Sequence, residues 1–212
     1  MKSAARKVVT VCLLLFVCSA AFGRTIALQF DDCDLMAAIV EEGPRHSWAS
    51  SNWSTPIFST ISITPGIKRS FLIRFPLDKI PKGQHIVYAE WTLNPHVVVP
   101  NSRLFIWRLL VDWGAGVNYN YRMLRPKPLA WTVPGARGNS SDRGTKPSAI
   151  IRMSQPGEQI VNVTEDVELW YTGAAPNYGW LICLEDTDSY VRMLSPLYEN
   201  RLNWELRVTY EP

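Results

Sequence analysis

The chain has 212 residues, of which 47% are hydrophobic, and its 22 basic and 19 acidic side chains give a formal net charge of +3. A chain of this length can bury one good-sized core, so we expect a single domain over residues 24–212. The surplus charge belongs to Lys2, Arg6 and Lys7, so the remaining chain is balanced. This balance argues against nucleic acid as a partner.

Residues 1–23 have the layout of a signal peptide. The three basic residues precede an apolar run over residues 8–17, and Ala21 and Gly23 are the small residues that a signal peptidase reads. The run is too short to span a bilayer permanently. We therefore expect cleavage after Gly23, a secreted protein that is extracellular or periplasmic, and no stable membrane span afterwards. Cys18 is a poor lipid acceptor because bulky Val17 precedes it.

Two cysteines, Cys33 and Cys183, remain after the signal peptide is removed. In an oxidising compartment they can form one disulfide that ties the N-terminal segment to a late strand. The alternative is a buried free thiol at Cys183 and an unrelated Cys33.

The rest of the chain alternates short apolar runs with turn residues, which predicts a series of strands. The predicted strands cover residues 25–30, 36–41, 57–63, 69–75, 86–93, 103–111, 149–153, 159–163, 178–184, 190–194 and 203–210. One helix is predicted, with Thr164 as its cap, Glu165 and Asp166 in its first turn and Gly173 at its end. This pattern favours an all-β antiparallel sandwich with one short helix that plugs an end.

Residues 69–95 predict the two strands around which the others are arranged. Alternate apolar residues share one face of each strand: Phe71, Ile73 and Phe75 in the first, and Val87, Ala89, Trp91 and Leu93 in the second. The last strand alternates in the same way, with Trp204, Leu206, Val208 and Tyr210 on its apolar face.

These two strands also carry a recognisable motif, Phe71-Leu72-x-Arg74-Phe75-x-Leu77 followed by Pro81-x-Gly83 and Ala89-x-Trp91-x-Leu93. Together with segments 111–116, 131–142, 163–170, 177–181 and 206–210, it resembles the DNRLRE family of secreted bacterial β-sandwich domains, a group that includes carbohydrate-binding modules of family 96. The resemblance implies a jelly-roll-like sandwich, secreted or on the cell surface, often an accessory to larger polysaccharide-associated proteins. It does not imply an enzyme.

A long irregular stretch over residues 112–148 is rich in Gly, Pro, Asn and aromatic residues. Such a loop inside a compact domain is usually functional or disordered, and its aromatic residues argue against disorder. Exposed rings beside basic side chains suit an acidic polysaccharide. The expected carbohydrate-binding residues are Trp48, Trp53, Tyr119, Tyr121, Arg122, Arg125, Lys127 and Trp131. The alternative is that Trp113 and Trp131 fold the loop back onto the sandwich.

No motif for catalysis is present around His46, His85 or His96, and no catalytic residue is predicted. Glycoside hydrolysis or elimination would need converging carboxylates, for which the candidates are Asp112, Asp142, Glu165, Asp166, Glu185, Asp186 and Asp188. No cofactor is expected, although a structural Ca²⁺ could use the cluster at residues 31–34, or Asn139 with Asp142.

Three candidate functions remain, and we give them in order of preference. The first is a secreted or cell-surface, non-catalytic module that binds carbohydrate, with acidic polysaccharide favoured by Arg122, Arg125 and Lys127. The second is a structural or protein-interaction module of the cell envelope, in which the same loop docks a cell-surface protein. The third is a polysaccharide hydrolase or lyase.

Overall fold

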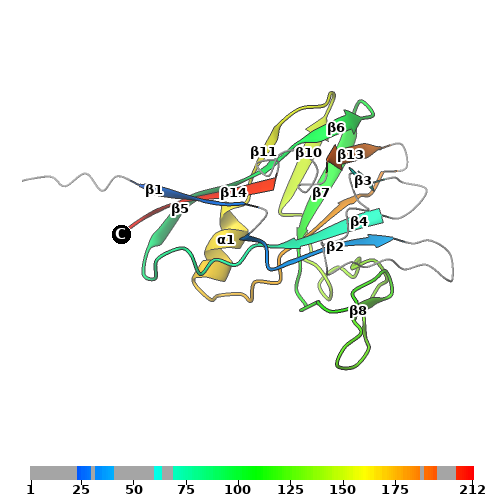
Figure 1. Ribbon diagram of the computed structural model, residues 1–212, viewed down its shortest axis with the longest axis horizontal. Coiled ribbons are helices and arrows are strands. Elements are labelled where there is room, and N and C mark those ends of the chain that lie inside the picture. Colours follow the sequence, from blue (N-terminus) through cyan, green and yellow to red (C-terminus); the bar gives the residue numbers. More distant parts are fainter. Residues whose placement is uncertain (1–22, 30–31, 41–59, 64–68, 187–188, 195–203) are drawn as a thin grey trace, which may run out of the picture.

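The protein is an all-β sandwich built from antiparallel sheets with one helix, as a computed structural model shows (Figure 1). The structure describes residues 23–29, 32–40, 60–63, 69–186, 189–194 and 204–212. The predicted fold class is confirmed, since sheets of antiparallel strands make up the body of the molecule and the helix lies against them.

Fourteen strands and one helix follow one another along the described chain. The strands are β1 (Arg24–Leu28), β2 (Leu35–Val40), β3 (Thr60–Ile63), β4 (Arg69–Arg74), β5 (His85–Leu93), β6 (Pro95–Val98), β7 (Ser102–Arg108), β8 (Tyr121–Met123), β9 (Leu129–Ala130), β10 (Ala149–Met153), β11 (Gln159–Asn162), β12 (Trp180–Leu184), β13 (Val191–Leu194) and β14 (Trp204–Glu211). The helix α1 (Thr164–Tyr171) lies between β11 and β12.

Two sheets form the layers of the sandwich. The first sheet has the order β1-β14-β5-β11, and the second has the order β10-β7-β12-β4-β2. The chain crosses from one sheet to the other at most of the connections between these strands, as it does in double-sheet all-β folds. A smaller sheet, β3-β13-β6, and a two-stranded hairpin, β8-β9, complete the fold.

The core between the two sheets is aromatic. Trp91 of β5 stacks on Trp180 of β12 with ring centroids 5.3 Å apart, and Trp204 of β14 lies 6.0 Å from Trp91. Phe71 of β4 packs on Trp204 at 4.9 Å. These rings come from both sheets and are all fully buried, so the alternation predicted for β4 and β14 places its apolar faces in this core.

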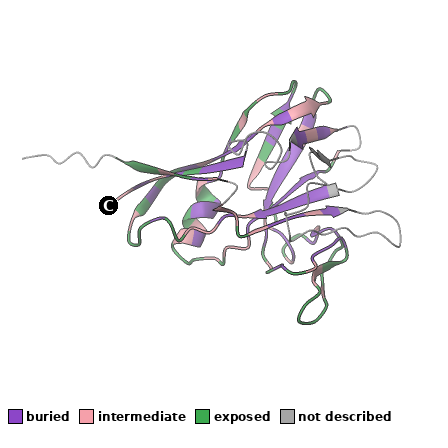
Figure 2. Ribbon diagram, viewed as in Figure 1, coloured by how far each residue is buried: buried purple, intermediate pink, exposed green. Residues whose placement is uncertain are grey.

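The outer face of the second sheet is also buried. Phe105, Trp107, Leu181 and Cys183 point away from the aromatic core and form a second cluster with residues of the following loop. Every residue of β12 is therefore buried (Figure 2). A strand that is covered on both faces needs a continuous apolar run, which explains the sequence WLICL.

The inward face predicted for Val87 is wrong, because a β-bulge lies at this point of β5. Ala89, Trp91 and Leu93 point inward as expected, but Val87 is 46% exposed. The pairing of β5 with β14 shifts register here, because Thr209 pairs with Tyr88 whereas Tyr210 pairs with Ile86. The extra residue on β5 turns Ile86 into the core in place of Val87.

The helix begins where it is predicted, but Thr164 is not its cap. Val163 occupies the N-cap position without a side-chain hydrogen bond. The Thr164 hydroxyl instead accepts from the backbone N–H of Ala89 at 2.8 Å, which ties the helix to β5. Val167 and Trp170 enter the aromatic core, where Trp170 lies 4.6 Å from Trp180. The helix therefore packs against one end of the space between the sheets.

The structure contains no disulfide between Cys33 and Cys183. Cys33 packs against the aromatic core between the sheets, whereas Cys183 lies in the second cluster on the outer face of β12. The intervening sheet explains why the two thiols do not meet.

Candidate functional site

Residues 109–148, which we call the covering loop, lie over the outer face of the second sheet. Trp113, Val117, Trp131 and Ala136 are buried there against Trp107 and its neighbours in the second cluster. Two short strands that the sequence did not predict, β8 and β9, form within the loop. The loop is thus an ordered layer of the protein.

Two indoles hold the covering loop in place. The Nε1–H group of Trp113 donates to the carbonyl oxygen of Tyr178 at 2.7 Å, and that of Trp131 donates to the carbonyl oxygen of Asn118 at 2.9 Å. The side-chain oxygen of Asn118 accepts from the N–H groups of Asn120 and Tyr121. Each buried indole therefore combines apolar burial with a satisfied donor, and both rings serve the folding of the loop.

Asp142 organises the other end of the covering loop. Its buried carboxylate accepts from the backbone N–H groups of Thr132 at 2.8 Å, Val133 at 2.8 Å and Gly138 at 3.1 Å. The neighbouring Arg143 lies over the ring of Trp107, with its guanidinium carbon 3.8 Å from the ring centroid. These contacts seal the loop against the sheet without leaving a buried charge unpaired.

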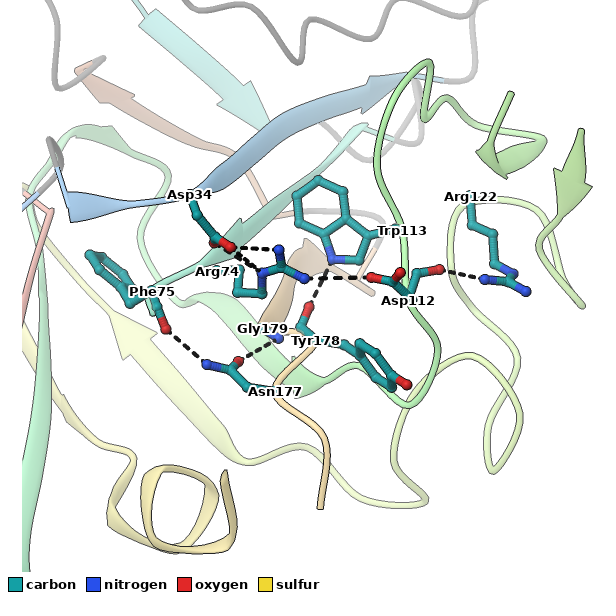
Figure 3. A network of polar contacts seen from close by, with 9 residues as sticks. All are labelled: Asp34, Arg74, Phe75, Asp112, Trp113, Arg122, Asn177, Tyr178 and Gly179. Carbon is teal, nitrogen blue, oxygen red and sulfur yellow. Dashed lines mark hydrogen bonds and ion pairs between the residues drawn. The ribbon is translucent and has the colours of Figure 1, made fainter. Parts of the chain in front are cut away.

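Arg74 links the sandwich to the covering loop in the network of Figure 3. Its Nε donates to both carboxylate oxygens of Asp34 at 2.9 Å, and its Nη1 lies 3.5 Å from Oδ1 of Asp112. The carbonyl oxygen of Asp112 accepts from Nη1 of Arg122 at 2.6 Å. Arg122 is therefore oriented by the loop, while its side chain stays half-buried.

Residues 121–130 form a hairpin that extends away from the sandwich (Figures 1 and 2). Strand β8 pairs with β9 through Tyr121 and Ala130, and residues 124–128 make the exposed tip. Tyr121 is 39% exposed and Leu124 is 38% exposed. Arg125 and Lys127 are exposed, and no ion pair joins either of them to another described residue.

The hairpin lies in a segment without acidic residues. Between Asp112 and Asp142 the charged residues are Arg122, Arg125, Lys127 and Arg137. The pairing of the two strands brings the first three onto one short projection beside Tyr121. A local positive field therefore exists on a chain whose charge is otherwise balanced.

The predicted carbohydrate-binding residues separate into three groups. Tyr121, Arg122, Arg125 and Lys127 come together on the hairpin. Tyr119 and Trp131 are 9% and 4% exposed, so the expectation that they present rings to solvent is wrong; the Trp131 ring packs in the second cluster instead. Trp48 and Trp53 lie outside the described residues.

The oxygens named as calcium ligands have protein partners. Asp32 accepts from Lys79 and from the N–H group of Gln29, and these contacts lower the pKa of its carboxyl although its partial burial acts in the opposite direction. Asp34 binds Arg74. Asn139 accepts from Nε of Arg143 at 2.8 Å, and Asp142 is held by three amides. Asp31 lies outside the described residues.

Most of the carboxylates considered as catalysts of glycoside cleavage also form ion pairs with arginine side chains. Glu185 pairs with Arg143 at 2.7 Å, and Asp186 binds Arg103, which holds the pKa of Asp186 below its usual range. Asp188 lies outside the described residues. Glu165 and Asp166 both line a cleft at the start of α1.

This cleft has a volume of about 360 Å³ and was not foreseen from the sequence. It lies between Arg108 at the end of β7, residues 144–148 of the covering loop, and residues 162–166 at the start of α1. At its base, Asp166 accepts from Nη1 of Arg108 at 3.2 Å and from Nε1 of Trp180 at 2.7 Å. Burial raises the pKa of Asp166 although Ser148, Trp180 and Arg108 act to lower it.

No protein-family model matches the chain, and no curated protein matches it in sequence. The resemblance to the DNRLRE family therefore stays a prediction that rests on the quoted motifs. Within the part of the chain that the structure describes, no helix has both the length and the apolar character needed to cross a membrane.

Proposed function

We propose that the protein is a non-catalytic module that binds an acidic polysaccharide through the hairpin at residues 121–130. The observation that supports this proposal most strongly is the joint exposure of Tyr121, Arg125 and Lys127 on a projection that has no acidic residue. Arg122 adds a third positive charge and is already oriented by its bond to Asp112.

The chemistry of the hairpin fits a carboxylated sugar chain. The face of a phenol ring can pack against the C–H side of a sugar, and Tyr121 offers such a ring at 39% exposure. Guanidinium and ammonium groups bind carboxylates through charge-assisted hydrogen bonds. Because Arg125 and Lys127 are exposed, a polymer can reach them without displacing part of the fold.

The proposed setting is a secreted or cell-surface protein of the DNRLRE type. The signal-like residues 1–23 and the family motifs support this setting. If it holds, the mature protein recovered from outside the cytoplasm begins at Arg24, which intact-mass measurement of the secreted chain would check. A mature chain that retains residues 1–23 would contradict it.

The function is tested by affinity electrophoresis of the purified protein in gels that contain polygalacturonate, alginate or neutral dextran. We expect retardation by the acidic polymers and free migration in dextran. Arg125→Ala and Tyr121→Ala are expected to weaken retardation several-fold each, whereas Lys82→Ala, at an exposed position far along the chain from the hairpin, is the matched control. Equal retardation of all four proteins would contradict the proposal.

A protein partner is the second candidate, because the covering loop also exposes apolar side chains. Leu110, Leu124 and Val133 are 37%, 38% and 43% exposed. If these residues dock a protein of the cell envelope, the purified chain migrates freely in every polysaccharide gel. Retardation by an acidic polymer that survives Leu124→Ser, a substitution that adds no charge to the hairpin, would instead favour the carbohydrate-binding function.

A further inference from the structure

The cleft at the start of α1 is separate from the hairpin and has a different chemistry. Its base is made by Arg108, Asp166 and Ser148, and exposed residues such as Lys146, Asn162 and Glu165 form its rim. Three stretches that are distant in sequence thus contribute polar side chains to one cavity of about 360 Å³. This volume is at the small end of the range for ligand sites, which runs from about 300 to 1,000 Å³.

The formal charges around the cleft cancel. Arg108 and Asp166 form an ion pair at 3.2 Å, and the rim adds one cation, Lys146, and one anion, Glu165. A charged ligand of either sign would meet a like charge as well as an opposite one. A neutral ligand with several hydroxyl groups can use both the donors and the acceptors.

The wall of the cleft combines polar and apolar surface in nearly equal parts, and Val163 and Pro147 are its apolar side chains. A purely hydrophobic ligand does not suit this wall, because the polar lining groups would lose hydrogen bonds to water without gaining partners. A sugar ring has a small C–H surface and a ring of hydroxyls, and so matches a wall of this kind.

Arg108 retains hydrogen-bonding capacity after its ion pair is formed. Its Nη1 binds Asp166, while its Nε is buried and meets no acceptor among the described residues. A buried donor without a partner carries a desolvation cost. Nε is closed off from the cleft, but the Arg108 side chain as a whole is 25% exposed and lines the cleft, so a ligand hydroxyl can accept from its remaining N–H groups without breaking the ion pair.

From these features we propose that the cleft is a second binding site, for a single neutral sugar unit. This site does not depend on the hairpin. It would let the protein bind a neutral residue independently of the acidic polymer proposed above.

The indole N–H group of Trp180 provides a reporter for the test. It donates to Asp166 at the base of the cleft, and its side chain is fully buried. In a ¹H–¹⁵N correlation spectrum, this signal would shift when a ligand perturbs Asp166 or Arg108. The probes are the methyl glycosides of glucose, galactose and mannose, with glucuronate and glucosamine as charged arms.

We expect a saturable shift of the Trp180 signal with at least one neutral glycoside, and weaker binding of both charged sugars. Arg108→Lys keeps a cation beside Asp166 but removes the further guanidinium N–H donors, and should weaken binding about tenfold. Thr145→Trp, at an exposed rim position, should block the cleft without disturbing the core. Lys127→Ala on the hairpin should leave the affinity unchanged.

The proposal is overturned if no neutral glycoside moves the Trp180 signal, or if glucuronate or glucosamine binds more tightly than the neutral sugars. It is also overturned if Thr145→Trp, shown to be folded by its spectrum, binds as the unaltered protein does. These outcomes are independent of polygalacturonate retardation, so a failure of the cleft and a failure of the hairpin can be told apart.

Discussion

Gly179 lies directly against the backbone of β4, at the start of β12. Its φ angle is +77°, and a Cβ atom added there would lie 2.1 Å from the carbonyl oxygen of Ile73. Any residue other than glycine is therefore disfavoured here twice, by the positive φ angle and by the clash of its Cβ atom with the backbone of β4. Asn177 fixes the same turn, because its side chain bonds the carbonyl of Phe75 and the N–H group of Gly179 (Figure 3).

Gly179→Ala should lower the free energy of unfolding by more than the roughly 1–3 kcal/mol that a positive φ angle alone costs. Gly83 is the matched control, since its φ angle is +79° and nothing lies within 4 Å of an added Cβ. Urea denaturation of Gly179→Ala and Gly83→Ala gives the comparison. Equal losses for the two variants would contradict the close approach to Ile73.

His96 makes the stability of the small sheet sensitive to acid. Burial and the positive charge of Arg192 lower its pKa, and Nε of Arg192 donates to Nε2 of His96 at 3.1 Å. The imidazole must be neutral to accept this bond. In the unfolded chain His96 binds a proton near pH 6.5, whereas in the folded protein it does so only at a lower pH.

The free energy of unfolding should therefore fall as the pH drops from 6.5 toward the lower pKa that His96 has in the folded protein. Below that pKa, His96 causes no further loss. Melting temperatures at about pH 8 and about pH 5 would measure the fall. His96→Gln removes the titration and should show a smaller decrease. A decrease as large as that of the unaltered protein would assign the acid sensitivity to other groups.

At the scale of elements, Trp113 and Trp131 are the two buried indoles of the covering loop that pack on the second sheet. Trp131→Ala removes a ring that is 4% exposed, together with its bond to Asn118. Truncation of a buried Trp costs about 3–5 kcal/mol, and this cost should appear as local opening of the loop.

Limited trypsin digestion tests this opening. Arg125, Lys127 and Lys146 each precede a proline, so cleavage within the loop is expected after Arg122, Arg137 and Arg143. These cleavages should accelerate in Trp131→Ala and stay slow in Tyr121→Ala, whose ring is already exposed. Equal rates in the two variants would contradict the anchoring role of Trp131.

Alternation of apolar residues was sufficient to predict the central strands and the all-β fold. It predicts β14 correctly, because Trp204, Leu206, Val208 and Tyr210 are all buried on one side. It fails at Val87, since a bulge depends on the pairing partner in β14 rather than on β5 alone. It also missed β6, β8 and β9, which are short or lie among Pro and Asn residues.

The candidate site was predictable only in part. The run without acidic residues predicts the basic character of the hairpin, which needs no knowledge of the fold. Whether a ring in the loop faces solvent depends on its packing, so Tyr121 and buried Trp131 could not be distinguished. The cleft joins Arg108, Lys146 and Asp166, which are distant in sequence, and no local pattern signals such a meeting.

At the scale of the whole molecule, the sandwich provides a rigid support for two polar features on its surface. The aromatic core and the second cluster bury both faces of the second sheet, and the covering loop is held on that sheet. The hairpin therefore projects from a fixed base (Figure 2), which lowers the entropy lost when Arg125 and Lys127 bind a polymer.

The central claim is that the charges of this hairpin, rather than the charge of the whole protein, bind the acidic polymer. Its most direct test is calorimetric titration of oligogalacturonate into Arg125→Ala/Lys127→Ala, with Arg24→Ala/Lys82→Ala as a control of equal charge at exposed positions. We predict that the hairpin variant loses at least about tenfold in affinity and most of the salt dependence, while the control keeps both. Equal affinities of the two variants would contradict the account.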